Sequence, residues 1–105
     1  MIIQINTDRN IEGDKALAER IEAVVRDSVE RYSEQITRVD VHLSDENSDK
    51  KVGTDAKRCL LTVDLAGLQP IAVSDQAQTL DQAVAGATKK LTHMIESTLG
   101  RLSNR

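Results

Sequence analysis

Apolar residues change their spacing along this chain, and this alternation limits the possible folds more than any other feature of the sequence. Two longer segments, residues 15–32 and 80–100, repeat apolar side chains every three or four residues, which is typical of amphipathic helices. Shorter segments alternate apolar and polar side chains, which is typical of strands with one buried face. These segments are residues 2–6, 36–44, 56–66 and 71–75. The expected element order is therefore β-α-β-β-β-α.

Turn and cap residues mark the ends of these segments. Asp14 is expected to cap the first helix, because its carboxylate can accept hydrogen bonds from amides of the first turn. Thr79 and Gln82 form a capping-box pattern at the start of the second helix, and Gly100 is expected near its end. Pro70 cannot donate a ladder hydrogen bond, so it suits the start of a strand or an edge strand.

Each predicted helix carries a single apolar stripe that is expected to be buried. In the first helix the stripe comprises Leu17, Ile21, Val24, Val25, Ser28 and Tyr32. In the second helix it comprises Leu80, Ala83, Val84, Ala87, Leu91, Met94, Ile95 and Thr98. Because each strand also has one apolar face, the economical arrangement has two layers.

The predicted fold is thus a single α+β domain over residues 1–105, a two-layer sandwich. A four-stranded mixed sheet carries both helices on one face, and its other face is open to solvent or to a partner. The first two strands are joined by a helix, so we expect them to be parallel with a right-handed crossover. The later strands are joined by short turns and are expected to form an antiparallel meander.

Aromatic residues are almost absent, and this excludes one mode of binding. Tyr32 is the only aromatic residue, so the core must be built from aliphatic side chains and alanine. Stacking of nucleobases on an aromatic platform is therefore excluded. The net charge of −3 argues against a free-standing nucleic-acid binder, unless the charge is distributed asymmetrically.

The numbers of cysteine and histidine residues exclude several further classes of site. Cys59 is the only cysteine, so the chain cannot form an internal disulfide, and with two histidines it cannot build a Cys/His metal cluster. No charged segment followed by an apolar run resembles a signal peptide, and the apolar runs are too short to span a bilayer. We therefore expect a cytoplasmic protein without a membrane interaction.

Chemical motifs are also missing from the sequence. There is no glycine-rich phosphate loop and no evident grouping of serine, histidine and an acid. We therefore predict no enzymatic activity and no cofactor. Asp45, Glu46 and Asp49 form an acidic cluster, but their spacing is not that of an EF-hand, so a solvated loop is favoured over a calcium site. Cys59 lies on an apolar strand face, which favours a core residue over a redox sensor.

One short stretch concentrates positive charge. Lys89, Lys90 and His93 lie on one side of the second predicted helix, Arg101 follows, and Glu96 interrupts the series. Such a patch can contact RNA phosphates. From the residues alone, an ordinary solvated helix face is favoured, because the net charge of the chain is negative.

Several short strings occur in an order and at spacings that are characteristic as a set. They are Asp8-Arg9-Asn10-Ile11-Glu12, Ala16-Leu17, Glu30-Arg31-Tyr32, Gln35-Ile36, Val39-Asp40-Val41-His42-Leu43, Ile71-Ala72-Val73-Ser74, Leu80-Asp81-Gln82-Ala83-Val84 and Lys89-Lys90-Leu91. Through these strings the chain resembles, over residues 2–99, the family of ribosome hibernation-promoting factors, ribosome-associated inhibitor A and sigma-factor modulation proteins. The resemblance implies the short form of the family, without the second domain by which long members pair ribosomes.

The resemblance also implies a function. Members of the family share the β-α-β-β-β-α fold and bind the small ribosomal subunit near the decoding centre, in the path of messenger and transfer RNA. This binding blocks translation in starved or stationary cells. The implied partner is 16S-type rRNA, and the implied phosphate contacts are Lys89, Lys90, His93 and Arg101. Weaker candidates are Arg9, Arg20, Arg26 and Arg31.

The chain departs from the family pattern in its charge, and this leaves an alternative open. The first predicted helix carries Glu19, Glu22, Asp27 and Glu30 among its basic residues, whereas family members are usually more basic there. The acidic turn over residues 75–79 lacks the family's aromatic residue. The alternative is a divergent member with weakened rRNA binding that acts as a protein-interaction or self-association module. A homodimer would then form through the last edge strand or the open sheet face.

Overall fold

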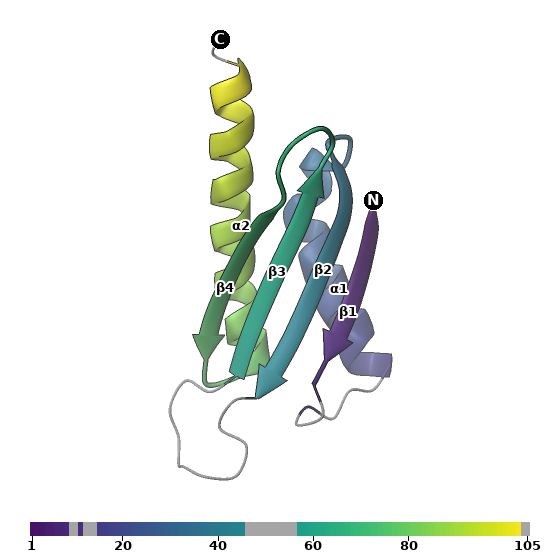
Figure 1. The fold of residues 1–105 in the computed structure, drawn as a ribbon. Coiled ribbons are helices and arrows are strands. Elements are labelled where there is room, and N and C mark those ends of the chain that lie inside the picture. Colours follow the sequence, from purple (N-terminus) through teal and green to yellow (C-terminus); the bar gives the residue numbers. More distant parts are fainter. Residues whose placement is uncertain (9–10, 12–14, 46–56, 104–105) are drawn as a thin grey trace.

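The computed structural model describes residues 1–8, 11, 15–45 and 57–103. Within them the elements follow the predicted β-α-β-β-β-α order (Figure 1). They are β1 (Ile2–Thr7), α1 (Lys15–Val29), a short 3-10 helix η1 (Glu30–Tyr32), β2 (Ile36–Asp45), β3 (Lys57–Leu65), β4 (Ile71–Ala77) and α2 (Leu80–Ser103). The predicted α+β fold class is confirmed.

The strands form one four-stranded sheet in the order β1-β2-β3-β4. β1 and β2 run parallel, and the β2–β3 and β3–β4 pairs are antiparallel, as the connections between them predict. The register places Ile3 opposite Val39 and Leu61 opposite Val73, so apolar side chains gather on one face of the sheet. Both helices cover that face (Figure 1), which leaves the other face open.

The core between the two layers is aliphatic. Side chains with no solvent-exposed area include Ile21 and Val25 of α1, Val41 of β2, and Leu91 and Ile95 of α2. Complete burial of an aliphatic side chain of this size contributes about 1.5–3 kcal/mol to stability. The open face of the sheet consists mainly of polar side chains, so the sheet has only one face to bury and needs only one layer of helices.

The two helices run side by side in the same direction. Arg20 of α1 pairs with Asp81 in the first turn of α2, and Arg31 of η1 pairs with Glu96 further along α2. The last turns of α2 extend beyond the ends of the strands (Figure 1). None of the helices in the described part of the chain is both long enough and apolar enough to cross a bilayer.

Two residues of the predicted apolar stripes are exposed. Val24 is 40% exposed and Met94 is 44% exposed, although their spacing from Ile21 and Leu91 matches the helical repeat. Only part of the apolar stripe of each helix packs against the sheet, because each helix covers only a few strands. Val24 and Met94 therefore lie on the flanks of their helices.

The ends of the elements agree in part with the predictions. The amide of Gln82 donates to Oγ1 of Thr79 at 3.1 Å, so the predicted cap of α2 is confirmed. The first helix changes to 3-10 geometry at Glu30 instead of continuing to Tyr32 as an α-helix. Gly100 lies near the end of α2, as predicted, but does not terminate it, because the helix continues to Ser103. Asp14 lies outside the described residues.

Candidate nucleic-acid interface

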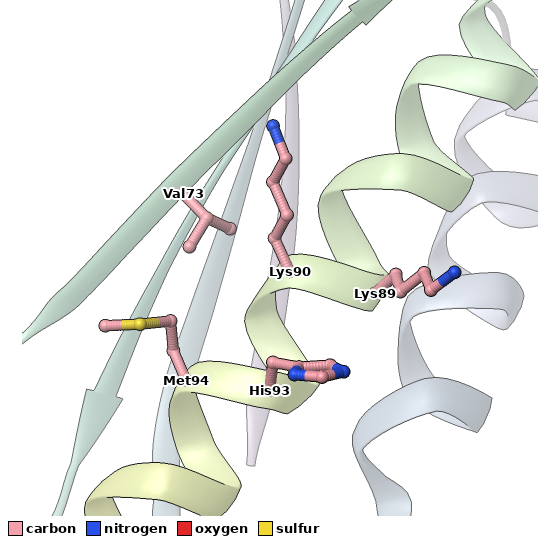
Figure 2. A pocket seen from close by; sticks show the side chains of 5 residues that line it. All are labelled: Val73, Lys89, Lys90, His93 and Met94. Atoms are coloured by element: carbon pink, nitrogen blue, oxygen red, sulfur yellow. The ribbon is translucent and has the colours of Figure 1, made fainter.

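The predicted basic patch lies on α2 beside the edge strand β4 (Figure 2). Lys90 and Met94 are four residues apart, so they share the helix flank that faces Val73 of β4. Lys89 and His93 are also four residues apart, and they project from the helix away from that strand. The five side chains line a shallow groove of about 490 Å³. Its floor is apolar and its rim carries the cationic groups.

Lys90 makes two contacts within its own chain. Its Nζ lies 3.1 Å from Oδ1 of Asp75 and donates to the main-chain oxygen of Ser74 at 2.9 Å. The charge of Lys90 is therefore balanced on the protein surface. In contrast, Lys89 and His93 make no ion pair with any residue that the structure describes. Both side chains are exposed.

Asp75 reaches α2 because residue 86 is a glycine. A Cβ atom on Gly86 would lie 1.7 Å from Oδ2 of Asp75 and 2.7 Å from its Cγ. Only a residue without a side chain lets the carboxylate lie against the helix at this point, four residues before Lys90. Asp75 and Gly86 are neighbours of the basic patch that the sequence did not predict, and a glycine within a helical repeat was the available signal.

The arginines predicted as weaker contacts are each held by an acid or lie outside the described residues. Arg20 pairs with Asp81 at 3.3 Å, Arg26 with Glu22 at 2.9 Å, and Arg31 with Glu96 at 2.7 Å. Arg9 lies outside the described residues. Exposed ion pairs of this kind contribute about 0–1 kcal/mol, so a phosphate can replace the carboxylate at little cost.

Arg31, Tyr32 and Glu96 form a cluster that joins the end of α1 and η1 to α2. The hydroxyl of Tyr32 donates to Oε2 of Glu96 at 2.8 Å, and the guanidinium of Arg31 lies 4.9 Å from the centre of the Tyr32 ring. Desolvation, followed by the hydrogen bond to Glu96, raises the pKa of Tyr32. Glu96 interrupts the basic series in sequence, but here it is turned toward Arg31 and its charge is balanced.

Arg101 lies beyond this cluster, near the end of α2. Its Nη1 donates to Oγ of Ser97 at 2.9 Å, which is a neutral partner one helical turn away. Arg101 therefore keeps its full positive charge available to a ligand. The structure places it on the same helix as Lys89 and His93, but not among the residues that line the groove.

The geometry therefore agrees with an anion-binding helix face of limited extent, and comparison with known proteins identifies the family. Residues 3–103 match the family described as sigma 54 modulation protein / S30EA ribosomal protein. The chain belongs to this family. The description of the sigma 54 modulation / S30EA family combines a modulation protein with a ribosomal protein and names no enzymatic activity.

Solved structures show the same fold. The chain is similar to the Protein Y N-terminal domain of Thermus thermophilus, with a TM-score of 0.72 and 22% identity over 93% of this chain and 99% of that chain. It is also similar to a ribosomal subunit interface protein from Coxiella burnetii, with a TM-score of 0.64 and 15% identity over 100% of both chains. No curated protein matches the sequence. The resemblance carried by the short strings is thus confirmed.

Cys59 and the acidic cluster at Asp45 are the remaining candidates for chemistry in this S30EA family member. Cys59 is fully buried, and desolvation, followed by the charge of Asp75, raises the pKa of its thiol to about 12. This agrees with its predicted role as an unreactive core residue. Asp45 pairs with Lys57 at 2.7 Å, whereas Glu46 and Asp49 lie outside the described residues. No group of three potential metal ligands occurs among the residues that the structure describes.

Proposed function

We propose that this protein binds the small ribosomal subunit near the decoding centre and inhibits translation by occupying the path of messenger and transfer RNA. The observation that carries the proposal is the family match, which extends over residues 3–103. A structural neighbour is described as a ribosomal subunit interface protein, which supports the same reading. The protein would act in the cytoplasm as a hibernation-type factor and need neither catalysis nor a cofactor.

The exposed side of α2 supports binding to the phosphates of 16S-type rRNA. Lys89, His93 and Arg101 present positive or protonatable groups that no acid of the described chain pairs with. Lys90 joins them when a phosphate takes the place of Asp75. Arg20, Arg26 and Arg31 can exchange their carboxylate partners for phosphates in the same way, because all three ion pairs are exposed.

A small number of phosphate contacts predicts moderate affinity and a measurable dependence on salt. Each neutralised phosphate contributes about 0.7 to 0.9 to the slope of log affinity against log salt concentration. Three or four contacts on α2 therefore predict a slope of about −2 to −4. Binding should weaken clearly between about 50 and about 200 mM salt.

Cosedimentation with purified small ribosomal subunits tests the proposal. At about 50 mM salt the protein should sediment with the subunit, and the double variant Lys89→Gln, His93→Gln should bind more weakly and reduce the magnitude of the slope by about 1.5, because it removes two contacts. Arg38→Gln is the matched control. It removes the same charge from the open face of the sheet, where Arg38 donates to Asp40, and should bind as the unchanged protein does. A protein that stays in the supernatant even at low salt would refute the proposal.

A further inference from the structure

β4 is an edge strand with few features that would prevent another strand from pairing with it. It pairs with β3 alone among the described strands, and that register is regular over the seven residues of β4. The side chains of β4 on the open face are small or neutral, namely Ala72, Ser74 and Gln76. Natural sheets often protect such an edge with a lysine. Here Lys90 has this role, because its Nζ covers the main-chain oxygen of Ser74.

A fifth strand added beside β4 would direct some of its side chains toward the helices, and the groove lies at the position that those side chains would reach. Successive side chains of a strand point to opposite faces, so every second residue of an added strand would face α2. Met94 is 44% exposed and Val73 is partly buried, and together they provide an apolar floor (Figure 2). The groove of about 490 Å³ is large enough for an aliphatic side chain.

The charge around the groove specifies the chemistry of its occupant. Lys89, Lys90 and His93 line it, so carboxylates two residues to either side of the aliphatic residue, on the same face of the added strand, would be attracted. A second copy of this chain is disfavoured, because pairing two β4 edges would bring two such basic rims together. RNA phosphates can contact the cationic rim, but RNA does not fit the strand edge and the floor, since it lacks the amide ladder that an edge strand pairs with and the aliphatic side chain that the floor accepts.

We propose that an extended acidic segment of a partner protein adds to β4 as a fifth strand and places an aliphatic side chain between Val73 and Met94. The main chain of the segment supplies the ladder hydrogen bonds, and carboxylates two residues before and after the aliphatic residue, which point to the same face, pair with Lys89 and His93. The ammonium of Lys90 moves from the oxygen of Ser74 to a carboxylate of the segment. This binding needs no ribosome, so it can be tested independently of rRNA binding.

Titration of the isolated protein with a synthetic peptide tests the proposal by nuclear magnetic resonance. The probe is a blocked peptide in which every second residue is threonine and the residues between are glutamate, valine and glutamate, so that the valine and both glutamates share one face. Its control has lysine in place of both glutamates. The glutamate peptide should shift the methyl signal of Met94 and the amide signals of β4 in a saturable way, and leave the other edge strand, β1, unchanged. The lysine peptide should bind at least about tenfold more weakly.

Two matched variants separate the groove from a general loss of structure. Met94→Glu places a carboxylate in the groove and should weaken peptide binding about tenfold or more. Val24→Glu makes the same kind of change on α1, at a residue that is 40% exposed, and should leave binding unchanged. Absence of a saturable shift, or equal binding of both peptides, overturns the proposal. So does a Met94 shift caused by self-association without peptide, or one produced by single-stranded RNA and not by the peptide.

Discussion

Gly86 controls how closely β4 and α2 approach at the level of a single residue. In the interior of a helix, replacing glycine by alanine normally stabilises the fold by about 1 kcal/mol. At Gly86 the new Cβ would overlap the carboxylate of Asp75 and lie 3.3 Å from its Cβ, which cannot move without the strand. We therefore expect Gly86→Ala to lower the free energy of unfolding by about 1 kcal/mol, as overpacked sites do.

Gly100→Ala provides the control for this prediction. Gly100 is also within α2, and no atom would lie within 4 Å of a Cβ at this position. The substitution should raise the free energy of unfolding by about 0.5–1 kcal/mol. Urea denaturation followed by circular dichroism measures both effects. If the two variants were stabilised equally, the close contact between Asp75 and Gly86 would be contradicted.

The cluster of Arg31, Tyr32 and Glu96 acts at the level of elements, because it holds the end of η1 against α2. Tyr32→Phe keeps the ring and removes the hydroxyl that donates to Glu96 at 2.8 Å. We expect a loss of about 0.5–1 kcal/mol in the free energy of unfolding, the usual net contribution of a hydrogen bond. A double-mutant cycle with Glu96→Gln, measured by urea denaturation, should show coupling between the two residues. Strictly additive losses would mean that the hydrogen bond does not join the helices.

Most of the elements could be predicted because their signals are local. The alternation in residues 36–44 and the cap at Thr79 involve neighbours in sequence, and both are found in the structure. Exposure of Val24 and Met94 could not be predicted, since helical spacing shows which residues share a face but not how wide a stripe the sheet covers. Gly100 lies in the last turn of α2 without ending it, because glycine weakens a helix but does not end it unless the backbone turns there.

For the candidate site, the sequence predicts which cationic residues take part but not their electrostatic surroundings. The spacing of Lys89, Lys90 and His93 predicted them on one side of a helix, and all three line the groove. Their electrostatic state depends on residues that are distant in sequence. Asp75 neutralises Lys90 from another element, strand β4, and Glu96 is matched by Arg31, which precedes it by 65 residues. No local pattern reports such pairings.

For the molecule as a whole, acids placed among the basic residues of both helices should limit the affinity for rRNA. Asp81→Asn releases Arg20 from its ion pair at the start of α2. We expect it to raise the affinity for the small subunit about twofold to fivefold, which corresponds to the 0.4–1 kcal/mol of an exposed pair. Asp40→Asn makes the same charge change on the open sheet face, where Asp40 pairs with Arg38. Equal gains in a sedimentation assay would show that net charge alone matters, and not its position.

The near absence of aromatic residues has a practical consequence. Tyr32 is the only aromatic side chain in the chain, and its hydroxyl lies at the junction of η1 and α2. All intrinsic ultraviolet fluorescence of the protein therefore originates from one ring at one known contact. A carboxylate hydrogen-bonded to a phenol provides a path for quenching, so the emission should brighten when this contact opens. The protein thus carries a built-in optical probe of its own helix junction, with no label and no background from a second fluorophore.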